Sequence, residues 1–316
     1  MTPQVLAGLR PQAYEHPSDA HALDLLTKTT GLDTLVKKLN SWGFERLLRV
    51  QLTGSYLRVT PDSFPDLHQT LATVCQTLDL LRQPDLYTGG SELNAFTAGV
   101  EKPLIMLYSG AVEALTPEEL LFVTGHEVGH IKSAHVLYYQ IAEFLPVIGE
   151  ILGAATFGVG ELLSVGMQAA LFRWKRMAEF TADRAGLLAC QDAEVATRAL
   201  MKLAGLPRRY YESVNTEDFM AQAREFQAMD ADQMTKVAKW FSSVGADHPW
   251  TVLRAQELLK WVDSGGYEQV LQAPASVVPL LPAGVAGFCA HCGWARKEAA
   301  TFCGGCGRPF AAGATR

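Results

Sequence analysis

The sequence predicts a mainly helical α+β fold with a small β-sheet, followed by a small C-terminal unit built on cysteines. Three observations favour it. Apolar residues recur at three- and four-residue spacing through most of the chain, and two short strand patterns, 94–97 and 104–108, flank a Gly/Pro turn. Four of the six cysteines form two CxxC pairs near the C-terminus. A 316-residue chain that is 48% hydrophobic can bury a substantial core.

The overall composition argues against two classes of partner and suggests a compartment. The net charge is −6 and no basic run stands out, so nothing favours nucleic acid or an anionic membrane as the main partner. The N-terminal MTPQVLAGLRPQAYEHPSD lacks the charged-then-apolar pattern of a signal peptide. Cys75 and Cys190 stand alone, which fits a reducing compartment. We therefore expect a cytoplasmic protein.

The first third of the chain predicts helices and one hairpin. Helical patterns run through residues 21–26, 32–39 and 64–81, the last with Cys75 as a small core residue. The run LLRVQLTGSYLRVT (47–60) alternates around a Thr-Gly-Ser turn and predicts a β-hairpin. The strands at 94–97 and 104–108 follow and lead directly into the next helix.

The helix that begins after Thr116 carries the first candidate site. Thr116 and Glu119 have the spacing of a capping box. His126 and His130 are four residues apart, so they share a helix face and can offer imidazole nitrogens to one Zn²⁺. Glu127 is placed to take a proton from a zinc-bound water. The pattern HEVGH also occurs by chance in helices whose histidines merely pack or face water, so other residues must decide.

The segment 136–172 after this helix is long and apolar. A spanning helix needs about 20 mainly apolar residues, but no charge-free run here exceeds eleven residues. Pro146 and several glycines argue against one unbroken helix. We favour two helices that pack on the catalytic core, on a partner or on a bilayer surface over true spans. Peripheral membrane contact through 136–172 stays open.

The later part of the chain predicts further helices and a linker. Helical patterns cover 170–192, 217–243 and 250–262, and another helix starts at Asp192 and is closed by Gly205 and Pro207. A loop at 245–250 contains His248. The Pro-containing stretch 272–287 predicts a linker.

A catalytic zinc usually has three protein ligands and one open position for water. Glu179 and Asp183 are four residues apart, on one face of the predicted helix 170–192. Glu179 can complete a His₂Glu site, while Asp183 can accept the free N–H of a zinc-bound imidazole and fix its tautomer. In isolation the two acids would be interpreted as a solvated helix surface. Beside an intact HExxH helix, we favour the site.

The strand pair before the motif helix offers a place for substrate. In zinc peptidases a sheet edge above such a helix can hold an extended peptide as an added strand. We therefore take Asn94, Ala95 and Phe96 as candidate substrate-binding residues on an edge strand. An ordinary structural hairpin is the alternative, and the sequence alone does not separate the two.

These motifs together resemble one family. HEVGH, a glycine-rich apolar insert and then EFTAD look like the HtpX-like and CAAX-prenyl-protease family of gluzincin zinc metallopeptidases. NAFTAGVEKPLIMLYSG resembles its edge strand and the strand before its active-site helix, and DHPWTVLRAQEL resembles its His-Pro loop followed by an arginine. The matches extend over about 92–262. Integral members carry clear spanning helices that are absent here, so the compact, non-spanning branch is the closer comparison.

The resemblance implies a role for each matching residue. His126, His130 and Glu179 would bind the catalytic zinc, Glu127 would act as general base and acid, and Asp183 would orient a ligand. His248 would stabilise the oxyanion or gate the metal, although a structural helix cap is nearly as good an interpretation. Two further residues carry no catalytic expectation. His135 is nine residues from His126, which would turn it to the opposite helix face as a structural residue, and Arg254 would pair with an acid near the cleft or on a helix surface.

The expected activity is that of a zinc metalloendopeptidase. Zinc would activate water and polarise the scissile carbonyl, and Glu127 would carry the proton to the leaving amine without a covalent intermediate. A role in protein quality control is an extension of the resemblance. The alternative is a latent or inactive zinc-stabilised adaptor or chaperone, which the intact Glu127 argues against because an adaptor needs no general base.

The C-terminal cysteines predict a second zinc. Cys289 and Cys292 form one CxxC knuckle and Cys303 and Cys306 the other, each followed by a glycine that allows a tight turn. Four thiolates make a closed structural site that a unit this small needs to fold. It looks like a short zinc ribbon, with redox-active pairs as the weaker alternative; His291 is expected to be exposed rather than a ligand.

The predicted organisation is therefore a metallopeptidase domain at 1–271, a linker at 272–287 and a zinc ribbon at 288–312. Two zinc ions are expected, one catalytic and one structural. The expected partner is a peptide or protein substrate, with no nucleic acid. The sequence gives no basis for an oligomeric state.

Overall fold

The computed structural model describes residues 3–28, 32, 43–143, 165–228, 250–273, 285–288 and 295–297. Its main elements before the apolar insert are α1 (Pro17–Thr27), α3 (Phe44–Ser55), β1 (Leu57–Arg58), α4 (Pro65–Thr77), β2 (Asp85–Gly89), β3 (Ala95–Ala98), β4 (Leu104–Tyr108), α5 (Ser109–Ala114), α6 (Pro117–Lys132) and α7 (Val136–Glu143). After it come α9 (Val165–Cys190), α10 (Ala193–Leu203), α11 (Thr216–Ala228), α13 (Thr251–Asp263), α14 (Gly266–Gln272), β5 (Val285–Phe288) and β6 (Ala295–Lys297). Two 3₁₀ turns, Pro11–Ala13 and Arg208–Tyr210, complete the set. The prediction of a mainly helical α+β fold is confirmed.

One mixed sheet lies against the helices, with strand order β1-β2-β4-β3. β2 pairs with β4 in parallel, and β3 pairs with β4 antiparallel, Thr97 opposite Ile105. The strands expected at 94–97 and 104–108 are thus confirmed as β3 and β4, whereas β2 was not foreseen. Because side chains alternate along a strand, Ile105 and Leu107 face the main core, and Leu104 and Met106 face a smaller cluster. β3 forms the edge of this sheet.

The β-hairpin predicted over 47–60 is wrong. Residues 44–55 form helix α3, and only 57–58 pair with β2 as a short strand. Leu52 is buried and Leu48 packs beside it, in a cluster with Tyr87 and Met106 on the outer face of the sheet. Leu48 and Leu52 are four residues apart, which places them on one face of a helix. The sequence of 47–60 therefore fits a helix as well as it fits the alternation of a strand. A helix also satisfies its own backbone hydrogen bonds without a partner strand.

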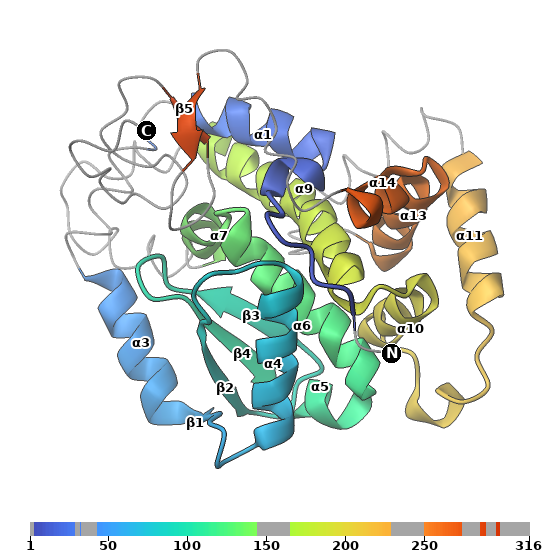
Figure 1. Cartoon of the computed structure of the whole chain (residues 1–316), viewed down its shortest axis with the longest axis horizontal. Coiled ribbons are helices and arrows are strands. Elements are labelled where there is room, and N and C mark those ends of the chain that lie inside the picture. Colours follow the sequence, from blue (N-terminus) through green and yellow to red (C-terminus); the bar gives the residue numbers. More distant parts are fainter. Residues whose placement is uncertain are drawn as a thin grey trace.

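The motif helix α6 runs through the middle of the molecule, between the sheet and α9 (Figure 1). The expected capping box is present: the Thr116 side chain accepts from the backbone N–H of Glu119, and Glu119 accepts from that of Thr116. Nearly every residue of α6 from Glu119 onward is buried. Helix α4 lies within the helix predicted over 64–81 and ends at Thr77. It supplies a second apolar surface for α6 and includes Cys75 as a buried core residue. Burial raises the pKa of the Cys75 thiol to about 12, so this cysteine stays protonated.

Small residues let α6 and α9 approach closely. A Cβ atom on Gly129 would lie 2.6 Å from the Cβ of Ala185, and one on Gly125 would lie 2.3 Å from that of Ala189. Gly186 on α9 faces Phe122 in the same way, with the Phe122 carbonyl oxygen 2.8 Å from its missing Cβ. The contact therefore depends on these glycines. It sets the distance between the side chains that the two helices direct toward each other.

The described ends of the apolar insert turn toward the protein interior. Leu137 and Ile141 of α7 and Met167 and Leu171 of α9 are buried in a second cluster around Trp174 and α1. This confirms helices that pack on the core at both ends of 136–172, whereas residues 144–164 lie outside the described ranges. Among the described helices, none has the length and apolarity needed to cross a membrane.

The later helices follow the predicted order. α10 begins after the N-cap Asp192, whose carboxylate accepts from the N–H groups of Glu194 and Val195. α13 matches the pattern expected at 250–262, and α11 matches the start of 217–243. The predicted linker 272–287 is described only at its ends, because α14 includes Gln272 and β5 begins at Val285. β5 pairs antiparallel with β6, and the first cysteine pair lies between them in sequence, outside the described residues.

Candidate active site

Three side chains from two helices converge at one point. His126 and His130 come from α6 and Glu179 from α9, and their ligand atoms all lie within 4.8 Å of one another. The two Nε2 atoms are 3.1 Å apart, and they lie 3.6 and 3.5 Å from the two Glu179 carboxylate oxygens. A tetrahedral zinc site with bonds of about 2.0–2.1 Å separates its ligand atoms by about 3.3–3.4 Å. The spacing therefore fits zinc.

The electrostatics of this cluster also fit a cation. All three side chains are buried, Glu179 at 1% exposure. Burial lowers the pKa of His130 to about 3, which keeps it in the neutral form that binds metal. Burial acts the same way on His126, but Asp183 and Glu179 outweigh it and raise the pKa of His126 above its ordinary value. The carboxylates thus favour a positive charge at this place, and a divalent ion supplies one.

Asp183 lies beside His126, on the side away from His130 and Glu179. Its Oδ1 is 3.0 Å from Nδ1 of His126, so the other ring nitrogen, Nε2, points at the convergence point. Arg254 of α13 donates to both oxygens of Asp183, at 2.8 and 2.6 Å. Burial would raise the pKa of Asp183, but Arg254 holds it below its usual range. Of the two partners expected for Arg254, the structure shows an acid beside the cleft.

His135 lies on the other side of the site, behind His130. The expectation that it faces away from the ligands is wrong, because α6 ends at Lys132 and the chain reverses. Ala134 adopts a left-handed backbone (φ 60°), and the His135 N–H bonds back to the carbonyl of His130 at 2.9 Å. This turn brings Nδ1 of His135 to 3.1 Å from Nδ1 of His130.

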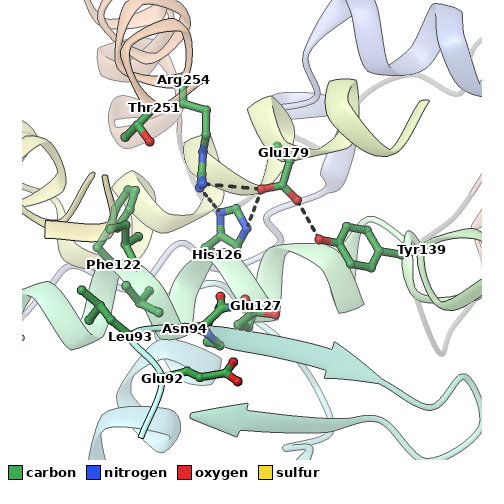
Figure 2. A pocket seen from close by; sticks show the side chains of 13 residues that line it. Glu92, Leu93, Asn94, Phe122, His126, Glu127, Tyr139, Glu179, Thr251 and Arg254 are labelled. Atoms are coloured by element: carbon green, nitrogen blue, oxygen red, sulfur yellow. Dashed lines mark hydrogen bonds and ion pairs between the residues drawn. The ribbon is translucent and has the colours of Figure 1, made fainter. Parts of the chain in front are cut away.

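Glu127 lines a pocket next to the three converging side chains, opposite Glu179 (Figure 2). The hydroxyl of Thr97 donates to its Oε2 at 2.6 Å. Thr97 faces α6 because it lies across from Ile105 on the inner face of the sheet. The contact holds the carboxylate at the pocket wall. Sequence reasoning missed Thr97, although the alternation of β3 puts it on the inner face together with Ala95.

The pocket has a volume of about 360 Å³ and extends along the start of β3. Asn94 and Ala95 line it, whereas the Phe96 ring packs against Tyr108, away from the pocket. Leu93, Phe122 and Leu203 give its wall an apolar part. Of the three residues expected on the edge strand, two thus reach the pocket with their side chains.

Tyr139 of α7 is a second residue that sequence reasoning missed. Its hydroxyl donates to Oε1 of Glu179 at 3.1 Å (Figure 2). Its ring centroid lies 4.8 Å from that of His130. It belongs to the apolar insert, where no sequence motif distinguishes Tyr139 from the residues beside it. His248 and the four ribbon cysteines lie outside the described residues.

Comparison with known proteins identifies relatives. A sequence profile of Peptidase family M48 matches residues 61–262. The chain is 31% identical over 274 residues to Plastoglobule-localized metallopeptidase 48, chloroplastic, of Arabidopsis thaliana, which covers 85% of this chain and 78% of that protein. It is 26% identical over 233 residues to Protease HtpX homolog 2 of Methanosarcina acetivorans, covering 66% of this chain and 76% of that one. No solved structure matches the chain.

The matched region spans more than half of the chain and includes both histidines and the glutamate that converge in the structure. Family and geometry therefore agree. This chain belongs to peptidase family M48 and is a zinc metallopeptidase, which acts on peptides or proteins.

Proposed function

We propose that His126, His130 and Glu179 bind the catalytic zinc and that Glu127 is the general base of an endopeptidase. The observation that carries this proposal is the convergence of three buried ligand atoms beside a carboxylate that Thr97 holds in the same pocket. An adaptor would have no use for that carboxylate, so proteolysis is favoured over the adaptor alternative.

Zinc held by His126, His130 and Glu179 would lower the pKa of a bound water and polarise the scissile carbonyl. Glu127 accepts the proton of the attacking water at its carboxylate and returns it to the amine that leaves. Asp183 accepts the Nδ1–H of His126 and so directs Nε2 of that ring to the convergence point. Tyr139 holds the Glu179 carboxylate through its hydroxyl.

Substrate is proposed to bind in extended form along β3. The strand is at the edge of the sheet, and Asn94 and Ala95 line the same pocket as Glu127. A peptide added there as a further strand would carry its scissile bond across the pocket. His248 is proposed to stabilise the oxyanion, because Thr251, three residues later, lines this pocket.

The first prediction concerns Glu127→Gln. The amide keeps the shape of the side chain but takes no proton, so kcat for peptide cleavage should fall by about 10²–10⁴-fold. Zinc content, counted by atomic absorption, should be unchanged. Glu118→Gln, an exposed change on the same helix, is the matched control and should cleave at the wild-type rate. Cleavage by Glu127→Gln at the wild-type rate would overturn the mechanism.

We also propose that the four C-terminal cysteines hold a structural zinc. The support is the spacing of the two CxxC pairs and the position of the first pair between two strands that pair with each other. Wild-type protein should contain two zinc ions per chain. Cys289→Ser should lower the count to one and leave cleavage of a short peptide intact. A single zinc in wild-type protein, retained in Cys289→Ser, would contradict the ribbon.

A further inference from the structure

We propose that Asp19 and His135 are positioning residues for His130. The N-terminal segment 3–28 thus supplies Asp19 to the side of His130 that faces away from the zinc site. The inference rests on the proposed zinc site. It extends the surroundings of that site to Asp19, in a part of the chain that the M48 profile, matching 61–262, does not cover.

A continuous hydrogen-bonded chain leads from the convergence point to Asp19. Nε2 of His130 faces His126 and Glu179, and its Nδ1 is 3.1 Å from Nδ1 of His135. Nε2 of His135 is in turn 3.0 Å from Oδ2 of Asp19. All three residues are at most 3% exposed. Water therefore has little access to this chain, and the protein groups set its protons.

The direction of each hydrogen bond follows from the metal. A neutral imidazole that binds zinc through Nε2 keeps its proton on Nδ1. His130 must then donate from Nδ1, and Nδ1 of His135 must accept. This leaves the His135 proton on Nε2, where the Asp19 carboxylate accepts it. Asp19 selects the tautomer of His135, and His135 selects the tautomer of His130 that directs Nε2 at the metal.

Asp19 is itself held in place. Thr181 of α9 donates its hydroxyl to the same Oδ2 at 2.6 Å, and the backbone N–H of His16 donates to that hydroxyl oxygen at 3.0 Å. Asp19 lies in the first turn of α1, where the helix N-terminus favours a negative charge. α1 packs directly on α9, the helix that carries Glu179. The N-terminal segment therefore presents Asp19 from a fixed position.

The two zinc-binding histidines are supported in different ways. His126 contacts a carboxylate directly, and Arg254 neutralises that carboxylate. On its Nδ1 side, His130 reaches a carboxylate through His135, and in the described part of the chain no arginine or lysine hydrogen-bonds to Asp19. Mutation of a residue that hydrogen-bonds to a metal ligand typically lowers metal affinity by about 10–100-fold. The hydrogen bond of Asp183 to His126 and the hydrogen-bonded chain from Asp19 to His130 should therefore both contribute to zinc affinity.

The first experiment uses the full-length, zinc-loaded wild type. Histidine-selective nitrogen NMR, with His130 and His135 assigned by substitution, reports which ring nitrogen carries the proton. We expect a proton on Nδ1 of His130 and on Nε2 of His135. The opposite tautomer at either histidine would overturn the proposal.

The second experiment measures zinc affinity of variants by competition with a chromophoric chelator. Two zinc sites are expected, and the binding isotherm that is absent in His126→Ala belongs to the site of His126, His130 and Glu179. His135→Phe, which keeps the ring but removes the acceptor, should weaken this site by about 10–100-fold, and Asp19→Ala by about 10-fold. His135→Gln, whose amide can accept and donate, should recover most of the loss. Cobalt-loaded His135→Phe should also show a shifted visible spectrum.

Matched controls separate positioning from a general loss of structure. Asp24→Asn changes an exposed acid on the same helix, and Trp174→Phe alters the ring that packs 5.6 Å from His135. Both should keep wild-type zinc affinity, even where thermal unfolding of the metal-free protein shows lower stability. If His135→Phe and Asp19→Ala bind zinc as wild type does, the positioning role is wrong. If wild type and His126→Ala bind the same number of zinc ions, the proposed zinc site itself is wrong.

Discussion

At the scale of single residues, the site is defined by what holds each chemical group. Glu127 is adjacent in sequence to the proposed zinc ligand His126, but its side chain is held by Thr97 from a different element. The bond is between a hydroxyl and a carboxylate, a type that typically contributes about 1.5–3 kcal/mol. Thr97 is 5% exposed, so water is a poor substitute for the hydroxyl. The strand along which substrate is proposed to bind therefore also positions the proposed general base.

Thr97→Val should lower kcat for peptide cleavage by about 10-fold. A rise of about 1.4 kcal/mol in the activation free energy, close to the lower end of what such a hydrogen bond contributes, corresponds to that factor. KM and zinc content should change little, since neither depends on the Glu127 orientation. Thr97→Ser keeps the hydroxyl and should retain most of the activity. Steady-state kinetics of the three proteins test this, and equal kcat values for Thr97→Val and wild type would rule out a positioning role.

At the scale of elements, the distance between α6 and α9 determines whether three ligands meet. His126 and His130 share a helix face by their spacing alone, but Glu179 reaches them only because Gly125, Gly129 and Gly186 remove side chains from the contact. Interiors are packed closely enough that one added methyl group requires a shift of neighbouring atoms. The glycine between the two histidines of HEVGH thus has a packing role rather than a turn role.

Gly129→Ala should destabilise the protein by about 1–3 kcal/mol, because its new Cβ would lie 2.6 Å from that of Ala185. It should also weaken zinc binding, since relief of the clash moves Glu179 away from the histidines. The double variant Gly129→Ala/Ala185→Gly transfers the methyl group to the other helix and should recover much of both losses. Urea unfolding and chelator competition measure the two effects. An additive loss in the double variant would show that this contact does not set the spacing.

At the scale of the whole molecule, the N-terminal segment joins distant parts of the domain. His16 donates its Nε2 proton toward Glu257 of α13 at 3.2 Å, and Lys260 donates to the same carboxylate at 2.7 Å. Burial opposes the charge of Glu257, but these partners outweigh it and hold its pKa below the ordinary 4.5. The same segment carries Asp19 to the back of His130. Docking of this segment is therefore coupled to the site.

Glu257 gives this coupling a pH dependence. A carboxyl whose pKa is lower in the folded than in the unfolded state stabilises the fold above the unfolded value, and this contribution is lost as pH falls through the folded value. Glu257→Gln should therefore cost about 1 kcal/mol at pH 7 and little well below pH 4.5. Thermal unfolding in the presence of chelator measures this without a contribution from zinc. Glu268→Gln, exposed on α14, is the control, and a cost of Glu257→Gln that is the same at both pH values would contradict the prediction.

The sequence alone determined the local features of this protein. The capping box of α6, the pairing partners β3 and β4, and the identities of the two histidines, Glu179 and Asp183 could all be predicted. Helix periodicity, capping and ligand spacing depend on residues within a few turns of one another, and these are neighbours in the chain. The family resemblance, which rests on the same motifs, agrees with the match to peptidase family M48.

Only the tertiary structure decided which side chains support those groups. Thr97, Tyr139, Arg254 and Asp19 reach the site from four different elements, and α3 proved to be a helix because its apolar face packs against the sheet. His135 could not be placed by helical spacing, since the chain leaves the helix at Lys132 and reverses at Ala134. Such contacts depend on how whole surfaces pack, and sequence separation carries no information about that.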